Sequence, residues 1–373
     1  MDRDELAAWL RLALVPRLGP QGARQLLAAF GPPERIFSQS LAALAEVLGP
    51  RLAPAVQTGP PGFAEQLAHT LAWLEEDPAH RAVTHLADTA YPALLLQIED
   101  PPLLLYRMGA LDLPTQPAVA VVGSRNPTPQ GAQNARAFAR SLAEAGFTVT
   151  SGLALGVDAA AHEGALVGRQ PGRACTVAVV GTGLDRVYPK QNHALARSIA
   201  EHGVLVSEYP LGTPPLAENF PRRNRLIAGL SHGTLVVEAA LQSGSLITAR
   251  LASEQGREVF AIPGSIHSPQ SRGCHQLLRQ GAKLVESAQD VLEDLRASVP
   301  GSGEAALAEA ATPAGHPGDP LLEAMGFDPV GLDALQARTG WPTEQLQARL
   351  LELELGGRIG RLPGGQYQRT ASA

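Results

Sequence analysis

Residues 118–125 read AVAVVGSR, and this short stretch decides the fold. A continuous apolar run that stops at a glycine is typical of a strand buried on both faces of a parallel sheet. The same kind of run recurs along the chain as FTVTSG (147–152), TVAVVGTG (176–183), VLVSEY (204–209), TLVVEA (234–239) and REVFAIPG (257–264).

Helical segments separate these runs. Helices are predicted over 129–146, 156–168, 192–203, 223–230 and 245–256. Strands that alternate with helices of this length indicate βαβ units and a sheet with helices on both faces. We therefore predict an α/β, Rossmann-like, doubly wound parallel-sheet domain within residues 61–296, with strands and turns over 84–111 leading into it.

Smaller units flank this domain. Residues 5–30 predict two helices around the turn VPRLGPQGA, either a helix–hairpin–helix or SAM-like domain whose turn meets a phosphate, or a plain helical packing module. We place that domain at 1–60, with 49–62 as a loop. Residues 297–318 are rich in Ala, Gly and Pro and predict a flexible linker. Residues 319–373 predict a winged helix whose second helix is acidic, which favours protein interaction or regulation over groove reading.

The composition and the N-terminal sequence indicate the cellular compartment. Two cysteines, Cys175 and Cys274, cannot form a disulfide framework, which fits a reducing cytosol. The chain starts MDRDE, with acidic residues where a secretory signal carries bases, and it holds no run of about 18 apolar residues. We expect a cytoplasmic protein that makes no membrane contact.

The formal net charge of -6 hides a basic centre. Residues 116–283 hold 16 basic and 10 acidic side chains, a formal charge of +6, between two acidic flanks. Local charge decides what a surface attracts, so this part of the chain is predicted to bind an anion.

Open parallel sheets bind ligands at the carboxyl ends of their strands, where small residues let backbone amides approach an anion. The predicted anion-binding residues there are Ser124 and Arg125, Gly152, and the pair Gly244 and Ser245 at a helix start. The loop YPKQN (188–192) adds Lys190, one of two lysines in the chain, and Asn192, which we expect to cap the next helix.

The segment NFPRRNR (219–225) gathers three arginines and one aromatic at a predicted helix start. Basic residues at a helix N-terminus oppose the helix dipole, which is tolerated when an anionic partner is present. An aromatic ring beside guanidinium groups suits single-stranded nucleic acid, through base stacking and phosphate contacts. The alternative is that these arginines pair with Glu218 and neighbouring acids. The predicted DNA contacts in the segment are Phe220, Arg222, Arg223, Asn224 and Arg225.

Signatures of catalysis are scarce. After the first strand the chain reads GSRNPTPQG, which is neither a dinucleotide fingerprint nor a phosphate-binding P-loop. The histidines have no metal-ligand spacing, and no histidine base stands beside a candidate nucleophile. We therefore predict no cofactor, no metal and no catalytic residue.

Several motifs together resemble the DNA-processing protein A family, called DprA or Smf. They are AVVGSRNPTPQG (120–131), TVTSGLALGVDAAAHEGAL (148–166), GTGLDRVYPKQN (181–192), LVSEYPLGTPP (205–215), NFPRRNRLIAGLS (219–231), VVEAALQSGSLITARLA (236–252) and FAIPGSIHSPQSRGCHQLLRQGA (260–282). The resemblance implies a non-catalytic, cytosolic protein that binds single-stranded DNA, protects it during natural transformation and loads the RecA recombinase. It also implies a homodimer built through the Rossmann-like domain, and a DNA pocket at Arg125, Lys190 and residues 220–225.

A second resemblance gives the alternative function. HGTLVVEA (232–239) resembles the PGGxGTxxE motif of nucleoside-monophosphate phosphoribohydrolases, whose glutamate serves catalysis. Here Ser231 and His232 replace the glycine pair, and Glu238 falls one place later. The departure argues against hydrolysis.

Overall fold

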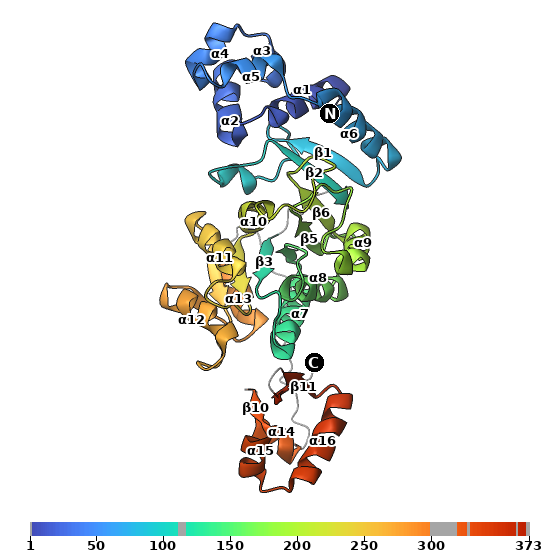
Figure 1. Ribbon diagram of the computed structural model, residues 1–373, viewed down its shortest axis with the longest axis vertical. Coiled ribbons are helices and arrows are strands. Elements are labelled where there is room, and N and C mark those ends of the chain that lie inside the picture. The colour runs from blue at the N-terminus through green and yellow to red at the C-terminus, as the bar shows by residue number, and fades with distance from the viewer. Residues whose placement is uncertain (1, 111–116, 299–318, 327–328, 363–364, 371–373) are drawn as a thin grey trace.

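The computed structural model describes residues 2–110, 117–298, 319–326, 329–362 and 365–370. Three units follow one another along its longest axis (Figure 1): a helical module at the N-terminal end, a large α/β domain, and a small winged helix. No helix within these residues is long and apolar enough to cross a membrane.

Six helices form the N-terminal module: α1 (Arg3–Leu14), α2 (Gly19–Phe30), α3 (Pro33–Phe37), α4 (Leu41–Leu48), α5 (Ala53–Thr58) and α6 (Phe63–Glu76). Our prediction of a loop over 49–62 was wrong, because α5 lies inside it and buries Ala53 and Val56. Its proline, Pro54, stands in the first helical turn, where the missing N–H has no partner to lose. Helix α6, which we assigned to the central domain, packs against α1 as well as against the sheet.

The central sheet has nine strands in the order β1-β2-β6-β5-β4-β3-β7-β8-β9. They are β1 (Arg81–His85), β2 (Leu104–Gly109), β3 (Ala118–Val122), β4 (Thr148–Ser151), β5 (Thr176–Val179), β6 (Val204–Ser207), β7 (Gly233–Val236), β8 (Glu258–Ala261) and β9 (Lys283–Leu284). Strands β3 to β9 are parallel, and the lead-in strands β1 and β2 add antiparallel at one edge. The predicted doubly wound sheet is confirmed.

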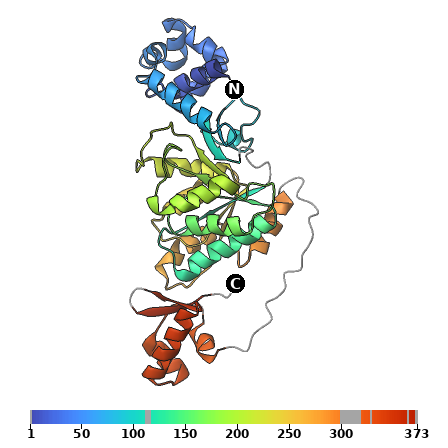
Figure 2. The ribbon, with the colours of Figure 1, turned by 90° about the vertical axis from the view of Figure 1, so that its right-hand side faces the viewer.

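Helices cover both faces of the sheet (Figure 2). One face carries α7 (Pro129–Glu144), α8 (Val157–Val167), α9 (His193–His202) and α13 (Ala288–Ser298), and the other carries α10 (Asn219–Gly229), α11 (Gly244–Glu254) and α12 (Arg272–Arg279). Strand β3 serves both layers: Val119 and Val121 pack with α7 and α8, while Ala120 and Val122 pack with α10. Because both faces of β3 are covered by helices, all of its residues are apolar.

The strand order reverses at β3. The chain adds β4, β5 and β6 on one side of it and β7, β8 and β9 on the other. Loops that leave β3 and β7 therefore diverge toward opposite faces and open a crevice at the carboxyl edge of the sheet.

The winged helix comprises α14 (Pro320–Met325), β10 (Val330–Gly331), α15 (Leu332–Thr339), α16 (Thr343–Leu355), β11 (Ile359–Leu362) and β12 (Gln366–Arg369). Its β-hairpin lies against the start of α7, where the Gln368 amide donates to Gln130 Oε1 at 3.3 Å. The predicted winged helix is confirmed. Of the predicted linker, residues 297 and 298 end α13, and 299–318 lie outside the described residues.

Candidate functional site

A cavity of about 690 Å³ lies at the switch point. The loop after β3, the first turn of α10 and the start of α11 line it. Seven predicted site residues meet there: Ser124, Arg125, Phe220, Arg223, Asn224, Gly244 and Ser245. Gly152, Lys190, Asn192, Arg222 and Arg225 are not part of its lining.

The loop after β3 is held by backbone contacts. The Ser124 N–H donates to the carbonyl of Glu238 at 2.7 Å, and the Ser124 hydroxyl accepts from the Asn126 N–H at 3.1 Å. Arg125 projects from this fixed loop, is exposed, and has no hydrogen-bond or ion-pair partner in the described part of the chain. Its charge is therefore available to a ligand.

Two aromatic rings form one wall of the crevice. The rings of Phe220 and Tyr188 lie 5.4 Å apart with an interplanar angle of 38°, and Tyr188 is 48% exposed. Our sequence reasoning chose Lys190 and Asn192 from the YPKQN loop and missed Tyr188. The signal was an aromatic at the head of that loop, in a chain with only five tyrosines.

The start of α11 opens on the same crevice. Ser243 caps the helix, and its hydroxyl lies 2.7 Å from that of Ser245. A side chain on Gly244 would enter open space, so the backbone there is accessible to a ligand. The cap satisfies the Ser245 N–H, and the N–H groups of the first turn that it leaves unbonded, together with the helix dipole, favour an anion at this end.

Arg223 is committed to the interior. It is 4% exposed, and its guanidinium donates to the carbonyl oxygens of Gly152, at 2.6 Å, and Val179. Burial lowers its pKa, an effect that the nearby carboxylate of Asp158 opposes. The guanidinium thereby joins the carboxyl ends of β4 and β5.

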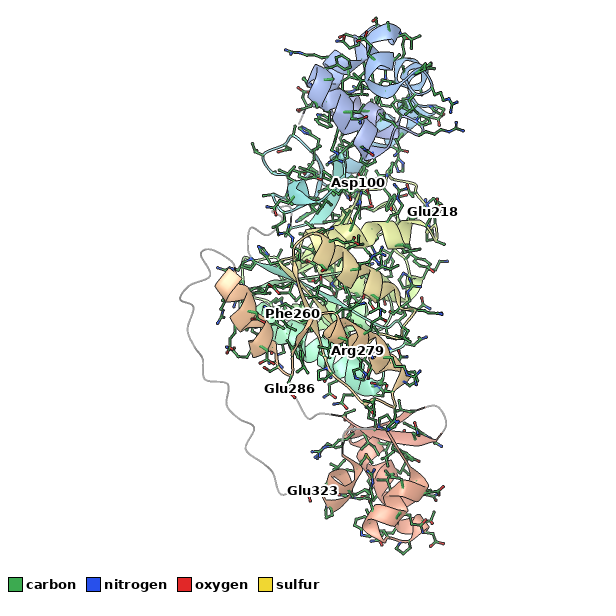
Figure 3. The ribbon with its side chains drawn as sticks, turned by 90° about the vertical axis from the view of Figure 1, so that its left-hand side faces the viewer. Asp100, Glu218, Phe260, Arg279, Glu286 and Glu323 are labelled. Carbon is green, nitrogen blue, oxygen red and sulfur yellow. The ribbon has the colours of Figure 1, made fainter. Side chains whose placement is uncertain are left out.

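Arg225 has internal partners as well. Its two terminal nitrogens donate to the Glu208 carboxylate at 3.0 and 2.6 Å, and its Nε lies 3.5 Å from Asp100. Asp100 marks the junction with the N-terminal module, and Glu218 lies at the start of α10 (Figure 3). Our alternative of pairing with acids thus holds for Arg225, through Glu208 and Asp100 rather than Glu218.

The remaining cations of the predicted site are exposed. Arg222, next to the buried Arg223, turns away from the crevice and lines a smaller cavity beside the N-terminal module. Lys190 stands in the short 3-10 helix η2 (Lys190–Asn192). Neither has a hydrogen-bond or ion-pair partner among the residues that the structure describes, so both are free to attract phosphate.

Asn192 occupies the N-cap position of α9, as predicted, but its side chain makes no capping hydrogen bond. Its side-chain amide donates instead to the carbonyls of Leu153, at 2.9 Å, and Ala154, at 3.1 Å. The backbone turns at Leu153 with a φ of 58°, which leaves the buried Leu153 carbonyl and the half-buried Ala154 carbonyl without a regular partner. Asn192 supplies the donor and so fixes the loop beside the crevice.

Glu238, the residue that the hydrolase alternative requires, is engaged elsewhere. Its carboxylate accepts from the Thr128 N–H at 2.9 Å and from the Thr128 hydroxyl at 2.6 Å, and it is not among the crevice-lining residues. Burial raises its pKa, which the two bonds from Thr128 oppose. Glu238 thus anchors the start of α7, which gives no support to a catalytic role.

Other reactive side chains are buried away from the crevice. Burial raises the pKa of the Cys175 thiol to about 11 and that of Cys274 to about 12, so neither is a thiolate at neutral pH. Burial lowers the pKa of His162 to about 3. The described residues contain no group of three His, Cys, Asp or Glu side chains arranged to hold a metal ion.

Comparisons with known proteins agree on one family. The family model for DNA recombination-mediator protein A matches residues 82–296, and that for the DprA winged helix domain matches 305–365. Protein Smf of Escherichia coli is 44% identical over 315 residues, covering 83% of this chain and 82% of that protein. DNA processing protein DprA of Streptococcus pneumoniae is 50% identical over 209 residues, covering 56% of this chain and 72% of that protein.

Two solved structures of DNA processing protein A are similar to this chain. The crystal structure of DprA from Streptococcus pneumoniae superposes with a TM-score of 0.64 at 39% identity, covering 79% of this chain and 98% of that one. DNA processing protein A from Helicobacter pylori, described for its single-stranded DNA binding mode, gives a TM-score of 0.52 at 34% identity and covers 59% of this chain and 98% of that one.

Proposed function

This chain belongs to the DNA recombination-mediator protein A family, also called DprA or Smf, and from that premise we propose that it binds single-stranded DNA in the crevice at the β3–β7 switch point. One observation carries the proposal. The aromatic pair of the exposed Tyr188 and the half-buried Phe220 stands in the same crevice as Arg125, whose charge has no hydrogen-bond or ion-pair partner among the described residues. The Helicobacter pylori relative, described as binding single-stranded DNA, supports it.

The chemistry of the crevice matches a single strand. Bases of an unpaired strand have free faces that can stack on aromatic rings, and a duplex keeps those faces covered. Phosphates of the same strand would lie at Arg125 and at the start of α11, with Lys190 nearby. Such contacts read the backbone and the faces of bases, so we expect affinity that depends on salt and little preference for sequence.

The predicted site residues divide by role in this proposal. Those that contact DNA are Ser124, Arg125, Lys190, Phe220, Arg222, Asn224, Gly244 and Ser245, to which we add Tyr188. Those that hold the crevice in shape are Gly152, Asn192, Arg223 and Arg225.

The wider role rests on the family. We propose that the protein acts in the cytoplasm during natural transformation as a non-catalytic mediator that protects incoming strands and loads RecA. We also propose that it works as a homodimer through its central domain. The binding chemistry of the crevice is compatible with a mediator, because stacking and phosphate contacts hold a strand without cutting it.

Fluorescence anisotropy tests the proposal. A labelled oligo-dT and a duplex of the same length would be titrated with full-length protein over a salt series, for wild type, Arg125→Ala and Arg51→Ala. Arg51 is an exposed arginine of the N-terminal module, remote from the crevice lining. We expect the single strand to bind more tightly, with loss in Arg125→Ala alone. Equal affinity for duplex, or an unchanged Arg125→Ala, would refute the proposal.

A further inference from the structure

The first turn of α10 separates two cavities. Phe220 lines the crevice, while Arg222, two residues later, lines a second cavity of about 230 Å³. The N-terminal module forms one wall of this second cavity through Leu10 of α1 and Gly19 and Pro20 of α2. The opposite wall comes from Leu104 and Tyr106 of β2 and from Tyr209.

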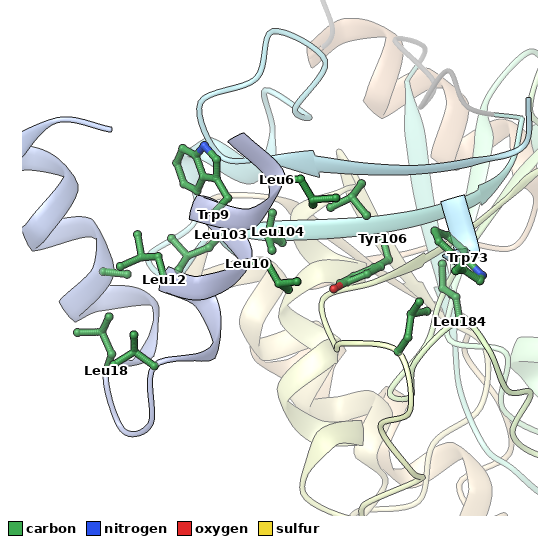
Figure 4. Close-up of a cluster of buried hydrophobic side chains, with 14 of the residues drawn as sticks. Leu6, Trp9, Leu10, Leu12, Leu18, Trp73, Leu103, Leu104, Tyr106 and Leu184 are labelled. Carbon is green, nitrogen blue, oxygen red and sulfur yellow. The ribbon is translucent and has the colours of Figure 1, made fainter. Parts of the chain in front are cut away.

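The second cavity contains an unsatisfied polar atom. Tyr106 is 1% exposed, and its hydroxyl has no hydrogen-bond partner among the described residues. Burial raises the pKa of Tyr106 to about 12, and the Thr70 side chain opposes this rise as a hydrogen-bonding neighbour would, but the Thr70 hydroxyl donates its proton to the Gln66 carbonyl at 2.9 Å. Figure 4 shows the Tyr106 hydroxyl pointing toward Leu10, which also lines the cavity. Buried hydroxyls are nearly always bonded, so this one points to a missing ligand.

The rim of the second cavity favours an anion. Arg222 is exposed there and forms no hydrogen bond or ion pair with the described residues, although its charge acts on Glu208 and Tyr209 and opposes the rise that burial causes in their pKa values. Gly19 and Pro20 begin α2, a helix of 12 residues with no side-chain cap, so its N-terminal dipole faces the same space. Glu208 also lines the cavity, but its charge is offset by the two hydrogen bonds from Arg225.

We propose that this second cavity binds one further nucleotide of the DNA strand held in the crevice. Arg222 and the start of α2 take its phosphate, and the apolar wall with the Tyr106 hydroxyl takes its base. The cavity volume of about 230 Å³ leaves room for a single base. This inference rests on the proposed function and assigns the N-terminal module a direct part in it.

The two cavities are close enough for one strand. Tyr209, from the wall of the second cavity, donates to the carbonyl of Asn219 at 3.2 Å, and Asn219 precedes Phe220 of the crevice. A strand that stacks on Phe220 therefore needs only to cross this helical turn to reach Arg222. A helix with its side chains is about 10–12 Å wide, which limits the crossing to a short step.

A length series tests the inference on the full chain. Oligo-dT of about 4 to about 16 nucleotides, the range of single-strand sites, would be titrated with wild type, Arg222→Ala, Tyr106→Phe and Ala13→Phe. Ala13 is an exposed residue of the cavity wall, and phenylalanine there would fill the space. For the shortest strands that bind, we expect Arg222→Ala and Ala13→Phe to have the affinity of the wild type. For longer strands, we expect both variants to bind about fivefold more weakly or worse, the low end of what one stacked base contributes.

The salt dependence separates phosphate from base. For long strands, Arg222→Ala should lower the slope of log affinity against log salt by about 0.7, whereas Ala13→Phe and Tyr106→Phe should leave it unchanged. Arg51→Ala is the charge-matched control. Losses that are equal at all lengths, or no loss in Arg222→Ala and Ala13→Phe, would overturn the inference. The proposed function would still stand if Arg125→Ala weakens every length, and it would fall separately if the wild type does not prefer single strands.

Discussion

The guanidinium of Arg223 donates to the carbonyl oxygen of Gly152 at 2.6 Å, and the missing side chain of Gly152 gives it the room to do so. A β-carbon on Gly152 would overlap the guanidinium. The contact joins the middle of α10 to the end of β4, so both residues support the crevice from within. We predicted both residues as DNA contacts. In our proposal they instead hold the crevice in shape, and their exposed neighbours contact the strand.

Arg223→Ala is expected to destabilise the protein. It leaves the buried carbonyls of Gly152 and Val179 without a donor and Asp158 without its cation. A broken buried charge contact costs about 3 kcal/mol or more, which corresponds to a melting midpoint lower by about 6 °C for a domain of this size. Scanning calorimetry would measure it.

The neighbouring arginine provides the control. Arg222→Ala removes the same side chain one position earlier, from an exposed site, and should change stability by less than about 0.5 kcal/mol. Equal melting of the two variants would show that Arg223 has no structural role. A double variant of both residues would mix DNA contact with folding and should be avoided.

The aromatic pair should contribute to affinity without affecting its salt dependence. Replacing both Phe220 and Tyr188 by alanine removes the stacking wall but no charge. We expect single-strand affinity to fall by about 1–3 kcal/mol per lost stacked base, with an unchanged salt slope. Anisotropy over a salt series would measure both quantities.

Tyr188→Phe keeps the ring and should bind single-stranded DNA like the wild type.

Arg125→Ala gives the complementary pattern. It removes one phosphate contact and should lower the slope of log affinity against log salt by about 0.7. A salt slope that changes with the aromatic residues would place them near phosphates and contradict stacking.

Much of the fold could be predicted from the sequence because strands buried on both faces leave long apolar runs. The burial and the partners of the three arginines at 222, 223 and 225 were harder to predict than the fold. Arg223 precedes Ile227 by four residues and Leu230 by seven, a helical repeat that places it on the buried face, so that signal was present. The partner of Arg225 was not predictable, because Glu208 follows a different strand and tertiary packing alone brings the two together.

His162 should make stability depend on pH. Its folded pKa of about 3 lies below the ordinary value of 6.5, because burial disfavours the charged ring. The contribution is therefore fully present above about pH 6.5 and is lost as the pH falls toward 3. Between pH 7 and pH 5, wild type should lose about 2 kcal/mol relative to His162→Gln, as measured by chemical denaturation at each pH.

Glutamine at this position keeps a polar partner for the Thr176 hydroxyl, which lies 2.7 Å from His162 Nδ1. The variant lacks a group that titrates in this range, so it reports all other pH effects on the protein. If the two proteins lost stability in parallel, His162 would be charged in the folded state, and its assignment as a neutral core residue would be wrong.

Glu238→Gln should destabilise the start of α7, and it should abolish no enzymatic activity. The carboxylate accepts two hydrogen bonds from Thr128, which itself caps α7 by accepting from the Gly131 N–H at 3.0 Å. Glutamine retains one acceptor, so we expect a loss of about 1–2 kcal/mol in unfolding free energy. Thr128→Ala should cost about 1 kcal/mol through the lost cap.

A double-mutant cycle decides whether the two residues act as one unit. If Glu238 serves only to hold Thr128, the double variant should be less destabilised than the two single losses added together. Base release from nucleoside monophosphates would be followed in parallel for wild type and Glu238→Gln. If Glu238 only anchors α7, neither protein should release a base. Release by the wild type that disappears in the variant would restore the hydrolase alternative.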